Sequence, residues 1–248
     1  MIVLITGSRG FLGGNLQTYL EAERGLTVLN HNRGQTSSEL REKVQKSSII
    51  YHFAGVNRTQ NPDDFQAVNV GLTEEICHFS AESALAGYKP KTIVYSSSRQ
   101  AALDNEYGVS KLEAERVLSK YTLDGMIGSV VFRLPGIFGP GARPNYNSVV
   151  ANFCDAIAQG IQPTIFDASR KLRLVYIDDV VKSMSLLAAL EPGVQQFMSV
   201  APEFEITVGE LYELLLSLRP ETSLGRLPSQ DEGALKLRLA QTLLHSLK

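Results

Sequence analysis

The sequence predicts an α/β fold in which a doubly wound parallel sheet is followed by a small C-terminal lobe. Short β-branched runs alternate with segments of helical period, which is typical of parallel strands covered by helices on both faces. A glycine-rich turn directly follows the first run, and glycine and proline cluster again at residues 134–144. With 248 residues, 44% of them hydrophobic, the chain can bury one full core. We expect one domain, in which about residues 1–135 form the sheet and its helices and about residues 136–248 form mainly the C-terminal lobe.

Each expected element follows from its residue pattern. β-branched apolar runs predict strands at residues 2–5, 27–30, 49–53, 92–96 and 129–134. Apolar residues at helical spacing predict helices between them, at residues 13–23, 38–45, 62–85 and 107–121. Beyond residue 144 we expect a helix, a strand and a helix at residues 148–159, 172–177 and 178–190. Thr207 is a suitable N-cap for a helix that ends near residue 218, and a last helix is expected at residues 232–247.

Composition narrows the classes of function. A net charge of -2 gives the chain no general attraction to nucleic acids or anionic membranes. Cys77 and Cys154 are isolated, which suits a reducing compartment, and the apolar run at residues 1–5 is too short for a signal or a membrane span. The four histidines are scattered without the spacing of metal ligands. We therefore expect a cytoplasmic protein with no metal and with no nucleic-acid or membrane partner.

The glycine-rich turn has the context of a dinucleotide-binding motif, because it lies between a predicted strand and a predicted helix. Gly7 permits the tight turn, Gly10 lets the backbone approach a pyrophosphate, and Gly13 allows close packing of helix on strand. The N-terminus of the helix presents free N–H groups to the phosphates. A turn that serves only packing is the alternative, and the strand–turn–helix context disfavours it. We expect a Rossmann-like cofactor site that includes Gly7, Arg9, Gly10, Phe11, Leu12 and Gly13.

The end of the second strand indicates which dinucleotide binds. Sites for NAD commonly place a carboxylate there to bind the ribose 2′-hydroxyl, but this strand ends in Leu29-Asn30-His31-Asn32-Arg33. Arg33, His31 and Arg9 could instead surround a 2′-phosphate, which suits the bidentate fork of arginine. The alternative is that Arg33 is an ordinary solvated charge. We expect NADPH (NADP+) as the cofactor in preference to NADH.

Tyr107 and Lys111 are the candidate catalytic pair. Four residues apart at the start of a helix, they lie on one face about one turn apart, and an ammonium beside a phenol favours the phenolate. Such a pair occurs by chance in many helices, so its weight comes from the glycine turn and from Ser96, Ser97 and Ser98 at a strand end. A hydroxyl there can orient a substrate carbonyl while Tyr107 transfers the proton. Ser98 is the preferred residue and Ser97 a second substrate contact, and Lys111 is also placed to bind the nicotinamide ribose.

With these motifs, the chain resembles the extended short-chain dehydrogenase/reductase superfamily, whose members carry Thr-Gly-x-x-Gly-x-x-Gly and Tyr-x-x-x-Lys and act on nucleotide sugars. Further landmarks of that superfamily are Asn69-Val70, the segment Val175-Tyr176-Ile177-Asp178-Asp179-Val180, and His52-Phe53-Ala54-Gly55. The resemblance implies that Tyr107 and Lys111 also contact the cofactor, together with Ala54 and Gly55.

A narrower resemblance is to bacterial polysaccharide-synthesis reductases, which use NADPH to reduce the 4-keto group of UDP-2-acetamido-2,6-dideoxy-hexos-4-ulose. It extends over about residues 1–218, and its most specific segment is Pro144-Asn145-Tyr146-Asn147-Ser148. In isolation such a loop would be ordinary turn chemistry. The resemblance implies that the loop binds the diphosphate and uracil of a nucleotide sugar through Arg143, Asn145, Tyr146 and Asn147.

Three departures qualify this resemblance. Arg99-Gln100 follow Ser98 where sugar-nucleotide 4,6-dehydratases carry an acid/base pair, so water elimination lacks its catalyst. Gly136 stands where the superfamily commonly has an asparagine that contacts substrate. The narrower family also carries a C-terminal metal-binding cupin domain, whereas this sequence ends at Lys248, so we expect a member in which that domain is absent or has been removed.

The leading interpretation is therefore an NADPH-dependent 4-ketoreductase of a UDP-linked 6-deoxy-hexosamine. A nucleotide-sugar 4-epimerase with the same Ser98, Tyr107 and Lys111 is the alternative, and a non-catalytic NADP-sensing protein is a weaker one. The helices at residues 62–85 and 107–121 are the expected contact if two chains form a homodimer.

Overall fold

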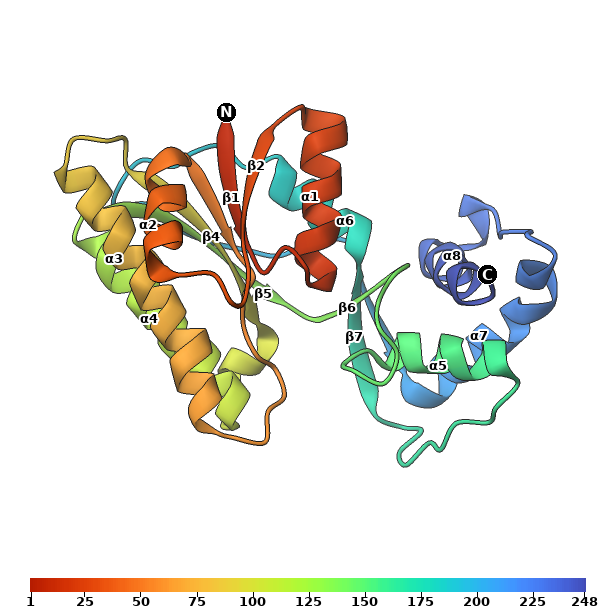
Figure 1. The fold of residues 1–248 in the computed structure, drawn as a ribbon. Coiled ribbons are helices and arrows are strands. Elements are labelled where there is room, and N and C mark those ends of the chain that lie inside the picture. The colour runs from red at the N-terminus through yellow and green to blue at the C-terminus, as the bar shows by residue number, and fades with distance from the viewer. The chain divides into compact units, whose positions relative to one another are not determined.

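Six parallel strands form the main sheet, in the order β2-β1-β3-β4-β5-β8 (Figure 1). The structure is a computed structural model that describes residues 1–248. Because β1 pairs with β2 on one side and with β3 on the other, the strand order reverses between β1 and β3. Open α/β sheets bind ligands at such a reversal, outside the carboxyl ends of the strands. The strands are β1 (Ile2–Thr6), β2 (Thr27–His31), β3 (Ile49–His52), β4 (Lys91–Ser98), β5 (Ile127–Leu134) and β8 (Gln195–Met198).

Helices cover both faces of this sheet, which confirms the predicted doubly wound α/β class. Figure 1 shows α2 (Ser37–Lys46), α3 (Leu72–Leu85) and α4 (Glu106–Leu123) on one face and α1 (Phe11–Arg24) on the other. No helix of the chain combines the length and the apolar character that crossing a bilayer requires. Two short helices lead into the longer ones: the π-helix η1 (Phe65–Gly71) and the 3-10 helix η2 (Arg99–Ala102).

Side-chain caps set where the helices around the candidate site begin. Asn105 caps α4, since its Oδ1 accepts a hydrogen bond of 2.9 Å from the Gly108 N–H. Thr36 and Glu39 form a reciprocal capping box at the start of α2. These caps satisfy backbone N–H groups that have no partner within the helix, so they fix the residue at which each helix starts.

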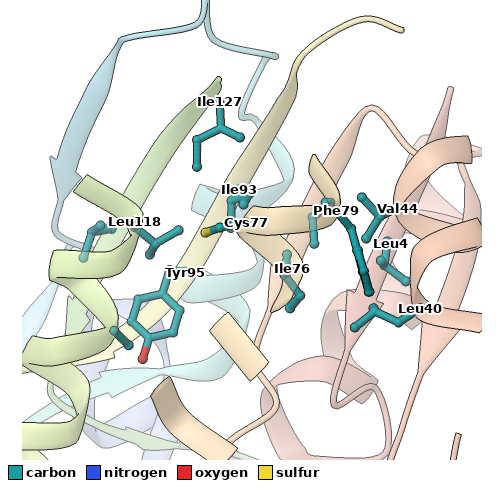
Figure 2. Close-up of a cluster of buried hydrophobic side chains, with 13 residues drawn as sticks. Leu4, Leu40, Val44, Ile76, Cys77, Phe79, Ile93, Tyr95, Leu118 and Ile127 are labelled. Carbon is teal, nitrogen blue, oxygen red and sulfur yellow. The ribbon is translucent and has the colours of Figure 1, made fainter. Parts of the chain in front are cut away.

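The hydrophobic core lies between the sheet and helices α2, α3 and α4 (Figure 2). Successive side chains of a strand point to opposite faces, so alternate residues of β4 and β5 face these helices. Ile93, Tyr95 and Val131 are such residues, and they pack with Ile76 and Leu118. Because the alternation continues along each strand, the next residues on the same face lie at the carboxyl ends of β4 and β5.

A second unit comprises residues 135–180 and 200–248 and contains a three-stranded sheet in the order β6-β7-β9. β7 pairs parallel to β6 and antiparallel to β9. Three longer helices, α5, α7 and α8, pack on one another in this unit. The elements are β6 (Gly136–Phe138), α5 (Val149–Gln159), β7 (Lys171–Tyr176), β9 (Glu203–Thr207), α7 (Val208–Ser223), η3 (Gln230–Glu232) and α8 (Ala234–Ser246). Helix α6 (Ile177–Ser185) begins in this unit, and its residues from 181 on belong to the first unit.

The structure departs from the predicted elements in the second half of the chain. Residues 181–199 belong to the first unit, where β8 pairs with β5, although the sequence pattern placed them in the lobe. The strand reads Gln-Gln-Phe-Met, which lacks the β-branched alternation that predicts a strand. Helix α6 ends at Ser185, short of residue 190, and α7 continues past Pro220 to Ser223.

Replacing Leu118 by Ala should lower the free energy of unfolding by about 2–5 kcal/mol, because it removes fully buried methyl groups and leaves a cavity. Leu123→Ala is the matched control on the same helix, since Leu123 is 84% exposed, and it should change the free energy by less than about 0.5 kcal/mol. Urea unfolding of both variants measures the difference. Equal losses would contradict the described core.

Candidate active site

The glycine turn leads from the carboxyl end of β1 into α1 and lies against the ends of the two neighbouring strands, β2 and β3. Gly7 has φ 74° and donates its N–H to the His31 carbonyl at 2.9 Å. A Cβ at Gly7 would lie 2.7 Å from the Ala54 nitrogen, and a Cβ at Gly13 would lie 2.4 Å from the Gly7 carbonyl oxygen. Neither position can hold a side chain without moving backbone, so close approach requires glycine at both, and the left-handed φ requires it at Gly7 as well.

Helix α1 presents an uncapped N-terminus at the end of this turn. Gly10 is its N-cap and supplies no side-chain hydrogen bond, and the first turn contains no acidic residue. The first N–H groups of a helix have no partner within it, and the helix dipole is positive at this end. The turn together with the start of α1, at Phe11 and Leu12, therefore has the chemistry of an anion-binding site, and a pyrophosphate fits it.

At the end of β2, Asn32 ties the strand to the glycine turn. Its side-chain amide donates to the Ser8 hydroxyl at 2.9 Å and accepts from the Arg9 N–H at 3.2 Å. Arg9 and Arg33 are exposed, whereas His31 is buried. Burial, and then the nearby Lys43, lower the pKa of His31. His31 is therefore mainly neutral near pH 7, and the positive charge at this strand end comes from the two arginines, not from all three predicted residues.

Lys111 lies buried at the carboxyl edge of the sheet. Its ammonium donates to the Ser96 carbonyl at 2.9 Å and lies 4.7 Å from the centroid of the Tyr95 ring. The same nitrogen is 5.9 Å from the centroid of the Tyr107 ring, so the structure brings together the predicted tyrosine–lysine pair. Burial lowers the pKa of Lys111 to about 8, and the carboxylate of Glu115 opposes this shift.

Tyr107 and Ser98 lie on the two elements that meet at this edge. Tyr107 is half-buried near the start of α4, with its ring centroid 6.2 Å from that of Phe65. Ser98 is the last residue of β4 and is half-buried, and its hydroxyl oxygen accepts from the Gln100 N–H at 3.1 Å. That hydroxyl can still donate its own hydrogen, which is what orienting a carbonyl oxygen requires.

Ser97 points to the opposite face and is bonded within the protein. It is 4% exposed, and its hydroxyl donates to the Glu115 carboxylate at 2.5 Å. Arg133, at the end of β5, binds the same carboxylate through Nε at 3.0 Å and through Nη2 at 2.6 Å. The hydroxyl hydrogen of Ser97 is thus already engaged, so the predicted role of Ser97 as a substrate contact loses support. Sequence reasoning missed Glu115, although its position four residues after Lys111 places both on one helix face.

Asn69 connects the loop after β3 to the catalytic helix. Its amide accepts from the Val56 N–H at 2.8 Å and donates to the Val56 carbonyl at 2.9 Å. The same amide donates to the Ser110 hydroxyl at 2.9 Å. A Cβ at Gly55 would lie 2.8 Å from the Asn69 oxygen and 3.6 Å from the Lys111 ammonium. Gly55 thus keeps the loop close to Lys111, on the side where a cofactor contact was predicted.

A buried hydrogen-bond chain holds the ends of β1 and β3 together below the turn. The Thr6 hydroxyl and the His52 Nδ1 are 2.7 Å apart, and the His52 Nε2 is 2.9 Å from the Thr73 hydroxyl. Burial lowers the pKa of His52 to about 3, so its imidazole is neutral at physiological pH. His52 is therefore a structural residue with both ring nitrogens engaged.

The second unit contains a cavity of about 520 Å³. It lies along α5 and the segment 161–167, and its lining includes Asn145, Asn152, Phe153, Ile165, Phe166 and Arg170. Asn145 adopts a left-handed φ of 56°, and its N–H donates to the Asn152 side chain at 2.7 Å. The other predicted substrate residues of this loop, Arg143, Tyr146 and Asn147, are exposed.

Three basic residues, Arg170, Lys171 and Arg173, lie at the start of β7 and differ in their contacts. Arg170 lines the cavity, whereas Lys171 and Arg173 pair with the neighbouring strand β9. Lys171 lies 3.0 Å and Arg173 3.4 Å from Glu205. Arg170 therefore makes no ion pair with β9, and its positive charge acts on the Asp167 carboxylate, which lines the same cavity together with Asp155. No group of three or more His, Cys, Asp or Glu residues is placed to hold a metal ion.

Replacing Gly108 by Ala should destabilise the junction between η2 and α4, since its Cβ would lie 2.1 Å from the Gln100 carbonyl oxygen. We expect a loss of about 1–3 kcal/mol in the free energy of unfolding, as for overpacked positions. Gly71→Ala is the control, because its Cβ would have no neighbour nearer than 3.7 Å, and it should leave stability unchanged or slightly higher. Thermal unfolding of both variants tests this difference. A Gly108→Ala variant as stable as the wild type would contradict the close approach of Gly108 to the Gln100 carbonyl.

Comparisons with known proteins agree with the geometry. The NAD dependent epimerase/dehydratase family matches residues 3–197 of the chain. The UDP-2-acetamido-2,6-beta-L-arabino-hexul-4-ose reductase of Pseudomonas aeruginosa is 38% identical over 219 residues, which cover 88% of this chain and 58% of the reductase. The capsular polysaccharide assembling protein CapF from Staphylococcus aureus aligns with a TM-score of 0.80 and 29% identity, over 100% of this chain and 65% of CapF. A UDP-glucose 4-epimerase of Thermus thermophilus in complex with NAD shares the fold, with a TM-score of 0.77, 19% identity and 99% of each chain covered.

The chain thus spans less than two thirds of the length of the reductase and of CapF, at 58% and 65%. The family match contains the glycine turn, the end of β4 and the Tyr107–Lys111 pair of α4, which are the features that the motifs indicated. The superfamily resemblance drawn from the sequence is therefore confirmed. The chain belongs to the NAD dependent epimerase/dehydratase family.

Proposed function

We propose that the chain is an NADPH-dependent reductase of the 4-keto group of a UDP-linked 6-deoxy-hexosamine, acting in the synthesis of bacterial surface-polysaccharide precursors. The observation that carries the proposal is the buried Lys111 ammonium 5.9 Å from the Tyr107 ring, at the sheet edge beside the glycine turn. The 38% identity to the Pseudomonas aeruginosa 4-ketoreductase supports the choice of substrate class.

The residues at this edge fit a dinucleotide. The cradle at Gly7 and Gly13 admits no side chain, and the buried Nδ1 of His31 and Oδ1 of Asn57 have no hydrogen-bond partner in the protein. The turn would hold the pyrophosphate, Arg9 and Arg33 a 2′-phosphate, and Lys111 the nicotinamide ribose. When bound, NADPH supplies the hydride that is added to the carbonyl carbon.

The chain's own residues complete the reduction with a proton. Tyr107 gives its phenolic proton to the carbonyl oxygen, so the ketone gains one hydride and one proton and becomes an alcohol. The Lys111 ammonium stabilises the phenolate that remains, and solvent then returns the proton. Each unit by which this lowers the pKa of Tyr107 corresponds to about 1.4 kcal/mol. The Ser98 hydroxyl orients the carbonyl oxygen and stabilises the charge that develops there.

We propose the cavity of the second unit as the site for the nucleotide part of the substrate. Its volume of about 520 Å³ is in the range of small-molecule pockets. The exposed ring of Phe166 offers a face for a planar base, and Arg170 offers charge for a diphosphate. Arg143, Asn145, Tyr146 and Asn147 follow as further contacts from the adjoining loop.

The decisive assay is NADPH oxidation with a UDP-linked 4-keto-6-deoxy-hexosamine. A reductase consumes one NADPH for each sugar that is reduced. Conversion of a nucleotide sugar to its 4-epimer without net consumption of NADPH would contradict the proposal and would favour the epimerase.

Replacing Tyr107 by Phe should lower kcat by about 100- to 10,000-fold, which is the usual size of a general acid's contribution. The affinity for NADPH should remain within about threefold, because the phenol acts mainly on the substrate carbonyl. Steady-state kinetics and fluorescence titration of NADPH measure the two effects. A variant that turns over at the wild-type rate would exclude Tyr107 as the acid.

The pH dependence follows from Lys111. With a pKa of about 8, its ammonium is charged below that pH and loses its charge as the pH rises through it. The charged form stabilises the Tyr107 phenolate, so kcat/KM should fall as the pH rises through about 8. Lys120→Met, at an exposed position of the same helix, should keep the wild-type profile. A flat profile across this range would contradict the role of Lys111.

Replacing Arg33 by Ala should weaken the binding of NADPH by about 10- to 100-fold while leaving NADH unchanged, as the loss of a charge-assisted hydrogen bond implies. Arg24→Ala, at the far end of α1, is the control and should affect neither dinucleotide. Equal effects of Arg33→Ala on both dinucleotides would contradict a 2′-phosphate contact.

A further inference from the structure

We propose that Glu115 is a positioning residue for the catalytic pair: its fixed carboxylate, one helical turn from Lys111, is the counter-charge of that ammonium and holds the end of β4 beside Tyr107. The inference rests on the proposed reductase function for its kinetic part. It concerns a residue that touches neither the substrate carbonyl nor the glycine turn and acts through Lys111.

The carboxylate of Glu115 is anchored from two strands. Glu115 is 3% exposed, and its Oε1 accepts from the Ser97 hydroxyl at 2.5 Å and from the Arg133 Nε at 3.0 Å. Its Oε2 accepts from the Arg133 Nη2 at 2.6 Å and from Nε at 3.2 Å. Arg133 is braced in turn, with its guanidinium carbon 5.5 Å from the Phe197 ring centroid of β8. The carboxylate therefore has one fixed position.

This fixed charge lies on the same face of α4 as the catalytic lysine. Glu115 follows Lys111 by four residues, which is one helical turn. Lys111 donates to the carbonyl of Ser96, and Glu115 accepts from the hydroxyl of Ser97, the next residue of β4. Lys111 and Glu115 are thus bound to consecutive residues of β4, at the strand end that carries Ser98.

The groups around Lys111 leave its charge dependent on Glu115. Tyr95 and His52 face it from β4 and β3, and Tyr107 faces it from its own helix. His52 is neutral, and burial holds the pKa of Tyr95 well above its usual value, so neither carries a charge near pH 7. Arg133 contributes positive charge, which Glu115 neutralises. Removal of the Glu115 charge would leave two neighbouring cations, one of them fully desolvated, without a counter-charge.

The consequence is a shift in pH dependence. Lys111 would lose its proton at a lower pH in the absence of the carboxylate, and the Tyr107 phenolate would then lose its stabilising charge over the physiological range. A purely structural role, in which Glu115 only holds α4 against β5, would instead lower stability and reduce activity equally at every pH.

The test compares Glu115→Gln with Glu113→Gln in two measurements. Glu113 lies on the same helix, and its side chain makes no hydrogen bond or ion pair in the structure, so its variant should match the wild type. For Glu115→Gln we expect the alkaline midpoint of kcat/KM for carbonyl reduction to fall by about one pH unit or more, a tenfold change in the ratio of charged to neutral Lys111. Activity at pH values below the shifted midpoint should return toward that of the wild type.

The second measurement needs no substrate. NMR titration of the Lys111 side chain, with its signal identified by its absence in Lys111→Met, should show that Glu115→Gln lowers the pKa of Lys111 below about 8. An unshifted Lys111 titration would overturn the inference, as would a rate profile that is lower but keeps the wild-type midpoint. Failure of the wild type to reduce any 4-keto sugar would overturn the proposed function alone, since this titration still reads the positioning.

Arg133→Gln separates the effect of the Glu115 charge on the pH profile from the effect of the ion pair on protein stability. It breaks the same ion pair but keeps the Glu115 carboxylate, so its alkaline midpoint should not fall, even where its thermal stability does. A midpoint lowered as far as in Glu115→Gln would overturn the inference. If Glu115→Gln does not fold, Glu115→Asp, whose carboxylate is withdrawn, should give a smaller shift in the same direction, and an unshifted midpoint there would also overturn it.

Discussion

A lysine ammonium that is buried yet charged is the constraint on which the rest of the site depends. Removing such a cation from water costs several kcal/mol unless the protein supplies compensation. Here the Ser96 carbonyl, the face of the Tyr95 ring and the carboxylate of Glu115 supply it. All three require that α4 begin close against the end of β4. The cap at Asn105 and the missing side chain at Gly108 allow that approach, so the burial of Lys111 and the local packing have the same cause.

The sheet topology explains why the cofactor elements meet this lysine. The order reverses between β1 and β3, so the glycine turn after β1 and the loop after β3 share one edge with the end of β4. Gly7 touches Ala54, and Gly55 lies next to Asn69 and Lys111. A chain of close approaches therefore runs from the glycine turn to helix α4, and glycine stands at Gly7 and Gly55, where a Cβ would collide.

The sequence predicted features that lie within single segments, and it missed features that depend on contacts between distant segments. The glycine turn and the Tyr107–Lys111 spacing lie within single segments, so the family and the parallel α/β class could be predicted and are confirmed. β8 could not be predicted, because Gln-Gln-Phe-Met lacks the β-branched alternation of a strand and only its pairing with β5 makes it one. The bond from Ser97 to Glu115 and the neutral state of His31 depend on burial that no local pattern indicates. The roles of Ser98, Arg33 and the loop at Arg143 remain predictions that the described experiments address.

The most direct test is a crystal structure of the chain grown with NADP+. We expect the pyrophosphate at the start of α1, the nicotinamide ribose within hydrogen-bond distance of the Lys111 ammonium, and the Tyr107 hydroxyl beside the nicotinamide ring. A dinucleotide bound elsewhere, or a nicotinamide ring turned away from Tyr107 with Lys111 out of reach of the ribose, would contradict this expectation.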